Sequence, residues 1–162
     1  MKKVKQYQLL LDLGGDVFLA IDSSGNKRIL AFQTPTNETE RRELLARGED
    51  AVKISEHPNL LRIFDVGIAD NGDIFLVYEQ VDFVSLQAAE RYLHRNTEAV
   101  TEIIRCALRV LQHLHSLGFR AGVIPLTRIA LTSDGRVCLD PSIARKQDHA
   151  VSDDLFYLAA IL

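Results

Sequence analysis

Residues 128–145, RIALTSDGRVCLDPSIAR, contain the small hairpin that decides how the second half of this chain is interpreted. Two runs of β-forming residues flank the turn Ser-Asp-Gly at 133–135. A glycine-containing turn between two such runs predicts a hairpin, because glycine accepts the positive φ angles of tight turns. A single carboxylate, Asp140, follows the second strand. Asp140 is therefore either a metal ligand or an acid with a structural role.

The first eighty residues indicate an antiparallel sheet with one helix. Runs rich in β-forming residues occupy 7–13, 16–22, 26–33, 60–69 and 73–81. Short glycine-containing turns separate the first three runs from one another and the last two from each other, and Asn71-Gly72 is the strongest hairpin indicator among them. A helix is expected after the polar stretch 34–43, with Asn37 as its cap and Glu40 three positions on. Gly48 within this helix is expected to weaken it by about 1 kcal/mol relative to alanine.

From residue 85 the spacing of apolar residues becomes that of helices. Ser85 can cap a short helix that ends near Arg95, and Asn96 or Thr97 opens a long one that Gly118 ends. One continuous apolar stripe marks the long helix, and it consists of Val100, Ile103, Ile104, Ala107, Leu108, Leu111 and Leu114. After a loop and the hairpin, the chain closes with an apolar helix from Asp154.

Charge and composition exclude several classes of partner. The formal net charge of the 162 residues is −3, without a block of like charge beyond the lysines of residues 1–5, so neither nucleic acid nor a lipid surface is expected as a partner. Cys106 and Cys138 are too dispersed for a disulfide framework or a zinc site, which favours a reducing compartment. The longest apolar run, 155–162, is far shorter than the ~20 residues that cross a bilayer. We expect a cytoplasmic protein that binds proteins or small ligands.

The order of the elements and several of their sequences resemble the protein kinase fold. In the first half, GDVFLAID (15–22) is similar to the strand after a kinase glycine-rich loop, and ILAFQ (29–33) is similar to the strand that carries the kinase lysine. EHPNLLRIFDVG (56–67) is similar to the turn after the regulatory helix, and FLVYEQVDFVSL (75–86) is similar to the hinge. In the second half, HSLGF (115–119) with RIALTSDGRVCL is similar to the catalytic-loop region, and DLFYLAAIL (154–162) to the start of the central C-lobe helix.

This resemblance implies an α+β, two-lobed architecture in one minimal kinase-like domain over residues 1–162. Its N-lobe of five antiparallel strands and one helix is expected at 1–81, its hinge at 82–84, and a truncated, mainly helical C-lobe at 85–162. A complete kinase would continue with several more helices.

The resemblance also places the nucleotide-binding positions of the N-lobe. Kinases cradle ATP phosphates with a glycine-rich loop and bind them with a lysine. Only Gly14 and Gly15 join the two matching strands here, and Gln33 stands at the position of the lysine. The glutamate that pairs with this lysine would fall at Arg47 or Gly48. We therefore expect a hairpin turn in place of a phosphate loop, and no lysine–glutamate ion pair.

The catalytic-loop positions also lack the residues that the kinase pattern requires. Ala121, Gly122 and Val123 take the places of the kinase His-Arg-Asp, and Arg128 takes that of the metal-binding asparagine. Valine cannot accept the proton of a substrate hydroxyl, and a guanidinium repels magnesium. Arg128 is expected to pair with Asp140 and neutralise it.

Two acids of the C-lobe match acids of the kinase pattern. Asp140-Pro141-Ser142 matches the metal-binding Asp-Phe-Gly if one residue is dropped before it. Pro141 has no aromatic ring to pack between lobes, and Ser142 lacks the conformational freedom of glycine. Asp154 matches a buried acid that supports the catalytic-loop backbone, and we expect it to brace that loop or to cap its own helix.

These positions predict a pseudokinase that is not an enzyme: a scaffold or regulator without phosphotransfer, ATP or any other cofactor or metal. The alternative is a nucleotide-binding protein or unorthodox phosphotransferase in which Asp140 recruits a metal. Partners are expected to be proteins, with a homodimer or a larger assembly among the options. The candidate interface is an apolar surface that the missing helices would leave uncovered, formed by Leu155, Phe156, Leu158, Ile161 and Leu162.

Overall fold

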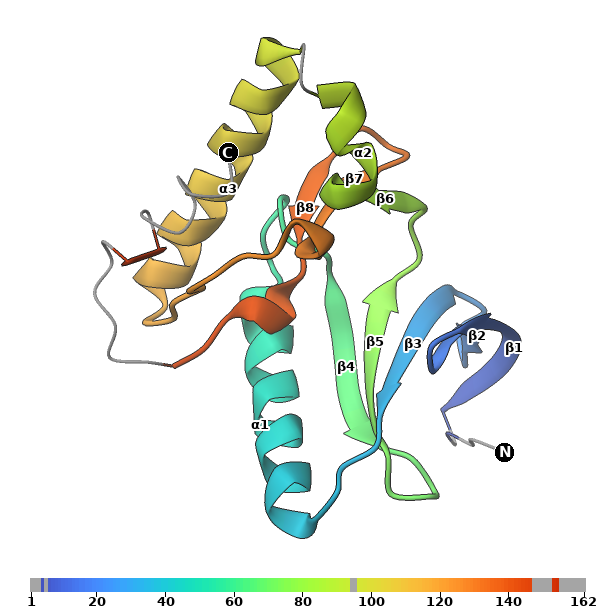
Figure 1. The fold of residues 1–162 in the computed structure, drawn as a ribbon. Coiled ribbons are helices and arrows are strands. Elements are labelled where there is room, and N and C mark those ends of the chain that lie inside the picture. The colour runs from blue at the N-terminus through green and yellow to red at the C-terminus, as the bar shows by residue number, and fades with distance from the viewer. Residues whose placement is uncertain (1–3, 5, 94–95, 147–152, 155–162) are drawn as a thin grey trace. The chain divides into compact units, whose positions relative to one another are not determined.

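The computed structural model describes Val4 and residues 6–93, 96–146 and 153–154. The chain divides into two compact units, the first made of residues 1–53 and 62–80 and the second of residues 54–61 and 81–162 (Figure 1). Residues 54–61, which are the last residue of the first helix and the turn after it, thus belong with the second half of the chain. The lobe boundaries predicted above, 1–81 and 85–162 around residues 82–84, remain a proposal.

The first unit contains the predicted five-stranded antiparallel sheet. Its strands are β1 (Tyr7–Gly14), β2 (Val17–Asp22), β3 (Lys27–Gln33), β4 (Ile63–Ile68) and β5 (Ile74–Glu79). They lie in the order β1-β2-β3-β5-β4. The turn at Asn71-Gly72 joins β4 to β5, and Gly72 has a φ of 87°, a value that glycine adopts without the steric cost that other residues incur.

Helix α1 (Glu38–Ile54) begins with the predicted cap. The Glu40 N–H donates to Asn37 Oδ1 at 2.9 Å, while the Glu40 carboxylate accepts from the N–H of Thr36 at 2.6 Å. Figure 1 shows α1 alongside β4, and buried Ala51 of the helix packs with Ile63 and Leu76 of the sheet.

Gly48 lies where α1 meets the sheet. A Cβ atom at this position would stand 2.4 Å from Val66 Cγ2 and 3.1 Å from Leu76 Cδ2. The glycine therefore permits the close approach of helix and strand. The sequence predicted only that Gly48 weakens the helix, and it did not indicate this packing role.

The described residues of the second unit include the helices α2 and α3 and a small sheet. Its elements are β6 (Phe83–Ser85), α2 (Leu86–Leu93), α3 (Thr97–Ser116), the 3₁₀ turns η1 (Leu126–Arg128) and η2 (Pro141–Ile143), and the hairpin β7 (Ile129–Thr132) and β8 (Val137–Leu139). The predicted hinge region contributes β6, which pairs with β7 by placing Phe83 opposite Thr132. Such a short strand is stabilised by its distant partner, so the local sequence did not indicate it.

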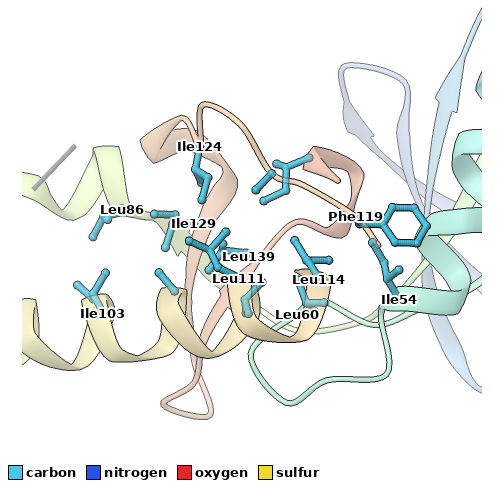
Figure 2. Packing of buried hydrophobic residues seen from close by; sticks show 14 residues of the cluster. Ile54, Leu60, Leu86, Ile103, Leu111, Leu114, Phe119, Ile124, Ile129 and Leu139 are labelled. Carbon is cyan, nitrogen blue, oxygen red and sulfur yellow. The ribbon is translucent and has the colours of Figure 1, made fainter. Parts of the chain in front are cut away.

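Helix α3 supplies much of the core of the second unit, but its buried face differs in part from the predicted stripe: Leu108 is 42% exposed, whereas Cys106 and Val110 are buried. Asn96 caps it, because its side chain accepts from the N–H of Ala99 at 3.0 Å. Figure 2 shows the α3 side chains facing the hairpin and the turn before β4; the labelled members of this buried cluster are Ile54, Leu60, Leu86, Ile103, Leu111, Leu114, Phe119, Ile124, Ile129 and Leu139. In the part of the chain that the structure describes, no helix combines the length and apolarity needed to cross a membrane.

Candidate functional site

Asp140 lies at the end of β8 and is almost fully buried. Its Oδ2 accepts from Arg128 Nη1 at 2.6 Å, and its Oδ1 accepts from the N–H of Ser142 at 2.9 Å. The N–H of Asp140 donates in turn to the carbonyl oxygen of Arg128 at 2.9 Å. The predicted Arg128–Asp140 ion pair is present, and the same carboxylate caps η2.

A cavity of about 320 Å³ opens beside this ion pair. It is lined by Leu61, Phe83, Thr127, Arg128, Ala130 and Asp140. The Arg128 side chain is 52% exposed, whereas that of Asp140 is 12% exposed, so the cation is the more accessible charge. Sequence reasoning missed Leu61 and Phe83 as members of the site, because they come from separate segments that only the fold brings together. It also missed Thr127, although this residue directly precedes Arg128 in the chain.

The geometry at Asp140 does not fit a magnesium ion. Magnesium requires several oxygen ligands in a regular arrangement, and the guanidinium of Arg128 places a positive charge against the one carboxylate at this position. Within residues 6–93, 96–146 and 153–154, no three His, Cys, Asp or Glu side chains are grouped closely enough to hold a metal ion.

Asp154 braces the loop that precedes η1. Its Oδ1 accepts from the N–H of Gly122 at 2.7 Å and its Oδ2 from the N–H of Ala121 at 3.0 Å. His115 Nε2 lies 2.6 Å from the same Oδ2. The bracing role predicted for Asp154 is confirmed, while Val123 stands 60% exposed beside these anchored residues.

The predicted site residues of the first unit lie at two strand ends. Gly14, with a φ of 88°, ends β1, and Gly15 (φ 59°) and Asp16 (φ 62°) form the tight turn to β2. Asp12 Oδ1 accepts from the N–H of Gly14 at 2.8 Å. Gln33 ends β3, with its Cα paired to Ile74 and its side chain exposed. Of the predicted site residues, the structure brings Arg128 and Asp140 into direct contact. Phe156 and the other interface candidates, Leu155, Leu158, Ile161 and Leu162, lie outside the described residues.

The sheet order and the elements that follow it define a protein kinase-like fold. The crystal structure of the Mycobacterium tuberculosis PknI kinase domain superposes on this chain with a TM-score of 0.79 at 20% sequence identity, covering 97% of this chain and 70% of that one. The C20A mutant of the same domain gives a TM-score of 0.75 at 21% identity, over 96% of this chain and 71% of that one. No family model matches the chain.

Curated relatives are named as serine/threonine-protein kinases. PAK mbt of Drosophila melanogaster is 26% identical over 125 residues, which are 77% of this chain and 19% of that protein. STE20 of Yarrowia lipolytica is 27% identical over 139 residues, which are 83% of this chain and 12% of that protein. The chain thus spans less than a quarter of the length of the curated relatives it matches.

These comparisons correct the prediction that the chain is not an enzyme. The relatives carry the names of serine/threonine-protein kinases and the similar structures are kinase domains, which points to an enzyme. The prediction had relied on a few side chains, chiefly Gln33, Val123 and Arg128, whereas the similarity covers most of the chain.

Proposed function

We propose that this chain acts through protein binding, as a scaffold or regulator with a kinase-like fold. The observation that carries the proposal is the 2.6 Å contact between Arg128 Nη1 and Asp140 Oδ2. The resemblance gives both positions to magnesium ligands, and here a guanidinium neutralises the carboxylate in a charge-assisted hydrogen bond. Protein binding needs no metal at this position, so the ion pair is compatible with it.

The apolar run after Asp154 is the surface that we propose for protein binding. Its partner would be a second copy of the chain or another protein of a larger assembly. Phe156 is its largest apolar side chain, and a charge there would oppose burial of the surface against a partner. We expect the wild-type chain to self-associate in light scattering and Phe156→Glu to shift it toward the monomer. Asp153→Lys, a charge change beside the run, is the control. A wild-type chain that stays monomeric at all concentrations would contradict self-association.

A second candidate is a nucleotide-binding or phosphotransfer function, which the names of the relatives favour. It requires Arg128 to leave Asp140, because the carboxylate cannot serve a cation while it is paired with the guanidinium. The kinase names belong to proteins much longer than this chain, so their activity is a proposal here.

Binding of Mg-ATP to the wild type and to Arg128→Asn tests the two candidate functions at the site itself. The substitution removes the cation and leaves an amide oxygen beside Asp140, so we expect Mg-ATP to raise the melting temperature of the variant more than that of the wild type. Arg136→Asn is the matched control, because Arg136 Nε contacts Asp134 at 2.8 Å in a second arginine–aspartate pair of the same hairpin. A clear magnesium-dependent rise in the wild-type protein, together with phosphotransfer to a test protein, would favour the second candidate.

A further inference from the structure

Two histidine rings stack within the second unit, one from the turn after α1 and one from α3. The ring centroids of His57 and His113 lie 4.9 Å apart, with 31° between the ring planes. Both residues are half-buried. Because an imidazole can gain a positive charge as the pH falls, a proton on His57 would place a charge directly against the ring of His113.

Hydrogen bonds define which nitrogen of each ring carries a proton. The Asn59 N–H donates to His57 Nδ1 at 3.1 Å, so this nitrogen carries no proton in the structure. His113 Nε2 lies 2.9 Å from the carbonyl oxygen of Ile54, which only accepts, so this nitrogen carries the proton. Protonation of His57 at Nδ1 would therefore remove the bond that this nitrogen accepts from Asn59.

The same turn is attached to β8 by contacts that involve no titrating ring. The Leu139 N–H donates to the Asn59 carbonyl oxygen at 2.8 Å, and the Leu61 N–H donates to the Leu139 carbonyl oxygen at 2.9 Å. The Asn59 side chain also donates to the Val137 carbonyl oxygen at 2.9 Å. The turn is thus held on two sides, and only the side facing α3 includes the stacked rings.

The electrostatic surroundings oppose a charge on His57. Burial, then the neighbouring His113 and Arg109 of α3, lower the pKa of His57 below its ordinary value of 6.5. Two further titratable groups lie near this turn. Glu56 directly precedes His57 in the chain, and Cys138 of β8 places its Sγ 3.6 Å from the Pro58 carbonyl oxygen. Since the pKa is lower when the turn is docked, docking is fully stabilised above the ordinary pKa and weakens as the pH falls through the lowered one.

We propose that the His57–His113 pair is a pH-sensitive contact that holds the turn against α3 while His57 is neutral and releases it when His57 gains a proton. The turn stays attached to β8 on release. The effect is a local conformational change at the point where the chain passes from α1 to β4, and it requires neither nucleotide nor metal.

Amide hydrogen exchange of the whole chain, followed by NMR from about pH 7.5 to about pH 5, tests the proposal in the range where histidine titrates. After correction for intrinsic exchange rates, protection of the Asn59 amide is expected to fall by up to about tenfold per pH unit, the dependence of a one-proton equilibrium. The Leu139 amide, which donates to Asn59 from β8, serves as the internal reference and is expected to keep its protection.

The variant His57→Asn/His113→Gln supplies the matched control, because each new side chain keeps the acceptor or donor of the ring it replaces and does not titrate. It is expected to abolish the pH dependence at Asn59. Equal pH dependence in this variant, or unchanged Asn59 protection in the wild type, would overturn the proposal. If the variant does not fold, the wild-type comparison of Asn59 with Leu139 decides alone, since parallel loss at both amides indicates general unfolding and refutes a local release.

Discussion

At the scale of single residues, Gly48 shows how packing reverses an expectation based on helix propensity. Gly48→Ala would gain about 1 kcal/mol from propensity in an exposed helix. Here the added methyl would stand 2.4 Å from Cγ2 of Val66, a stiff β-branched residue on β4, and overpacking of this kind typically costs about 1–3 kcal/mol. We expect Gly48→Ala to lower the free energy of unfolding by about 1 kcal/mol, measured by urea denaturation.

The pair with Val66 also provides the control for this prediction. Val66→Ala removes the methyl group that the new Cβ would meet, so the double variant is expected to be more stable than the sum of the two single changes. A Gly48→Ala protein that is more stable than the wild type would show that the helix moves away from β4 at little cost.

At the scale of elements, the sequence predicted those structures whose signals are local. The Asn71-Gly72 turn and the Asn96 cap lie within a few residues of the structure they specify, and both are present as expected. Strand β6 was missed because Phe83–Ser85 pairs with β7, whose residues lie more than forty positions later in the chain. A three-residue strand carries too little periodicity to be separated from a connecting segment.

The residues of the candidate site also differ in how well the sequence predicted them. The pairing of Arg128 with Asp140 was predicted because the kinase resemblance places both residues at positions of magnesium ligands. Leu61 and Phe83, which line the same cavity, come from segments that no short-range pattern links to the hairpin of β7 and β8. Ring stacking between His57 and His113 was likewise missed, since it depends on how the turn after α1 docks on α3. Sequence patterns thus identified the charged pair, while its apolar surroundings required the fold.

At the scale of the whole molecule, neither compact unit is one continuous stretch of chain. The chain changes unit at 53/54, 61/62 and 80/81. Ile54 and Leu60, each 1% exposed, belong to the core of the second unit although they precede β4. A fragment of residues 81–162 lacks both, and truncating a buried Leu or Ile typically costs about 2–5 kcal/mol, a large share of the ~5–15 kcal/mol that stabilises a domain. We expect this fragment to show no cooperative thermal transition by far-UV circular dichroism.

The fragment 54–162 tests whether the missing turn is the cause, because it restores both core residues in the second unit. It is expected to unfold cooperatively, and the same fragment carrying Ile54→Ala and Leu60→Ala is expected to behave like residues 81–162. Since the substituted fragment has the full length of its parent, the comparison separates lost core packing from an effect of chain length. Cooperative unfolding of residues 81–162 at the melting temperature of 54–162 would mean that the residues from 81 onward form a complete core without the turn.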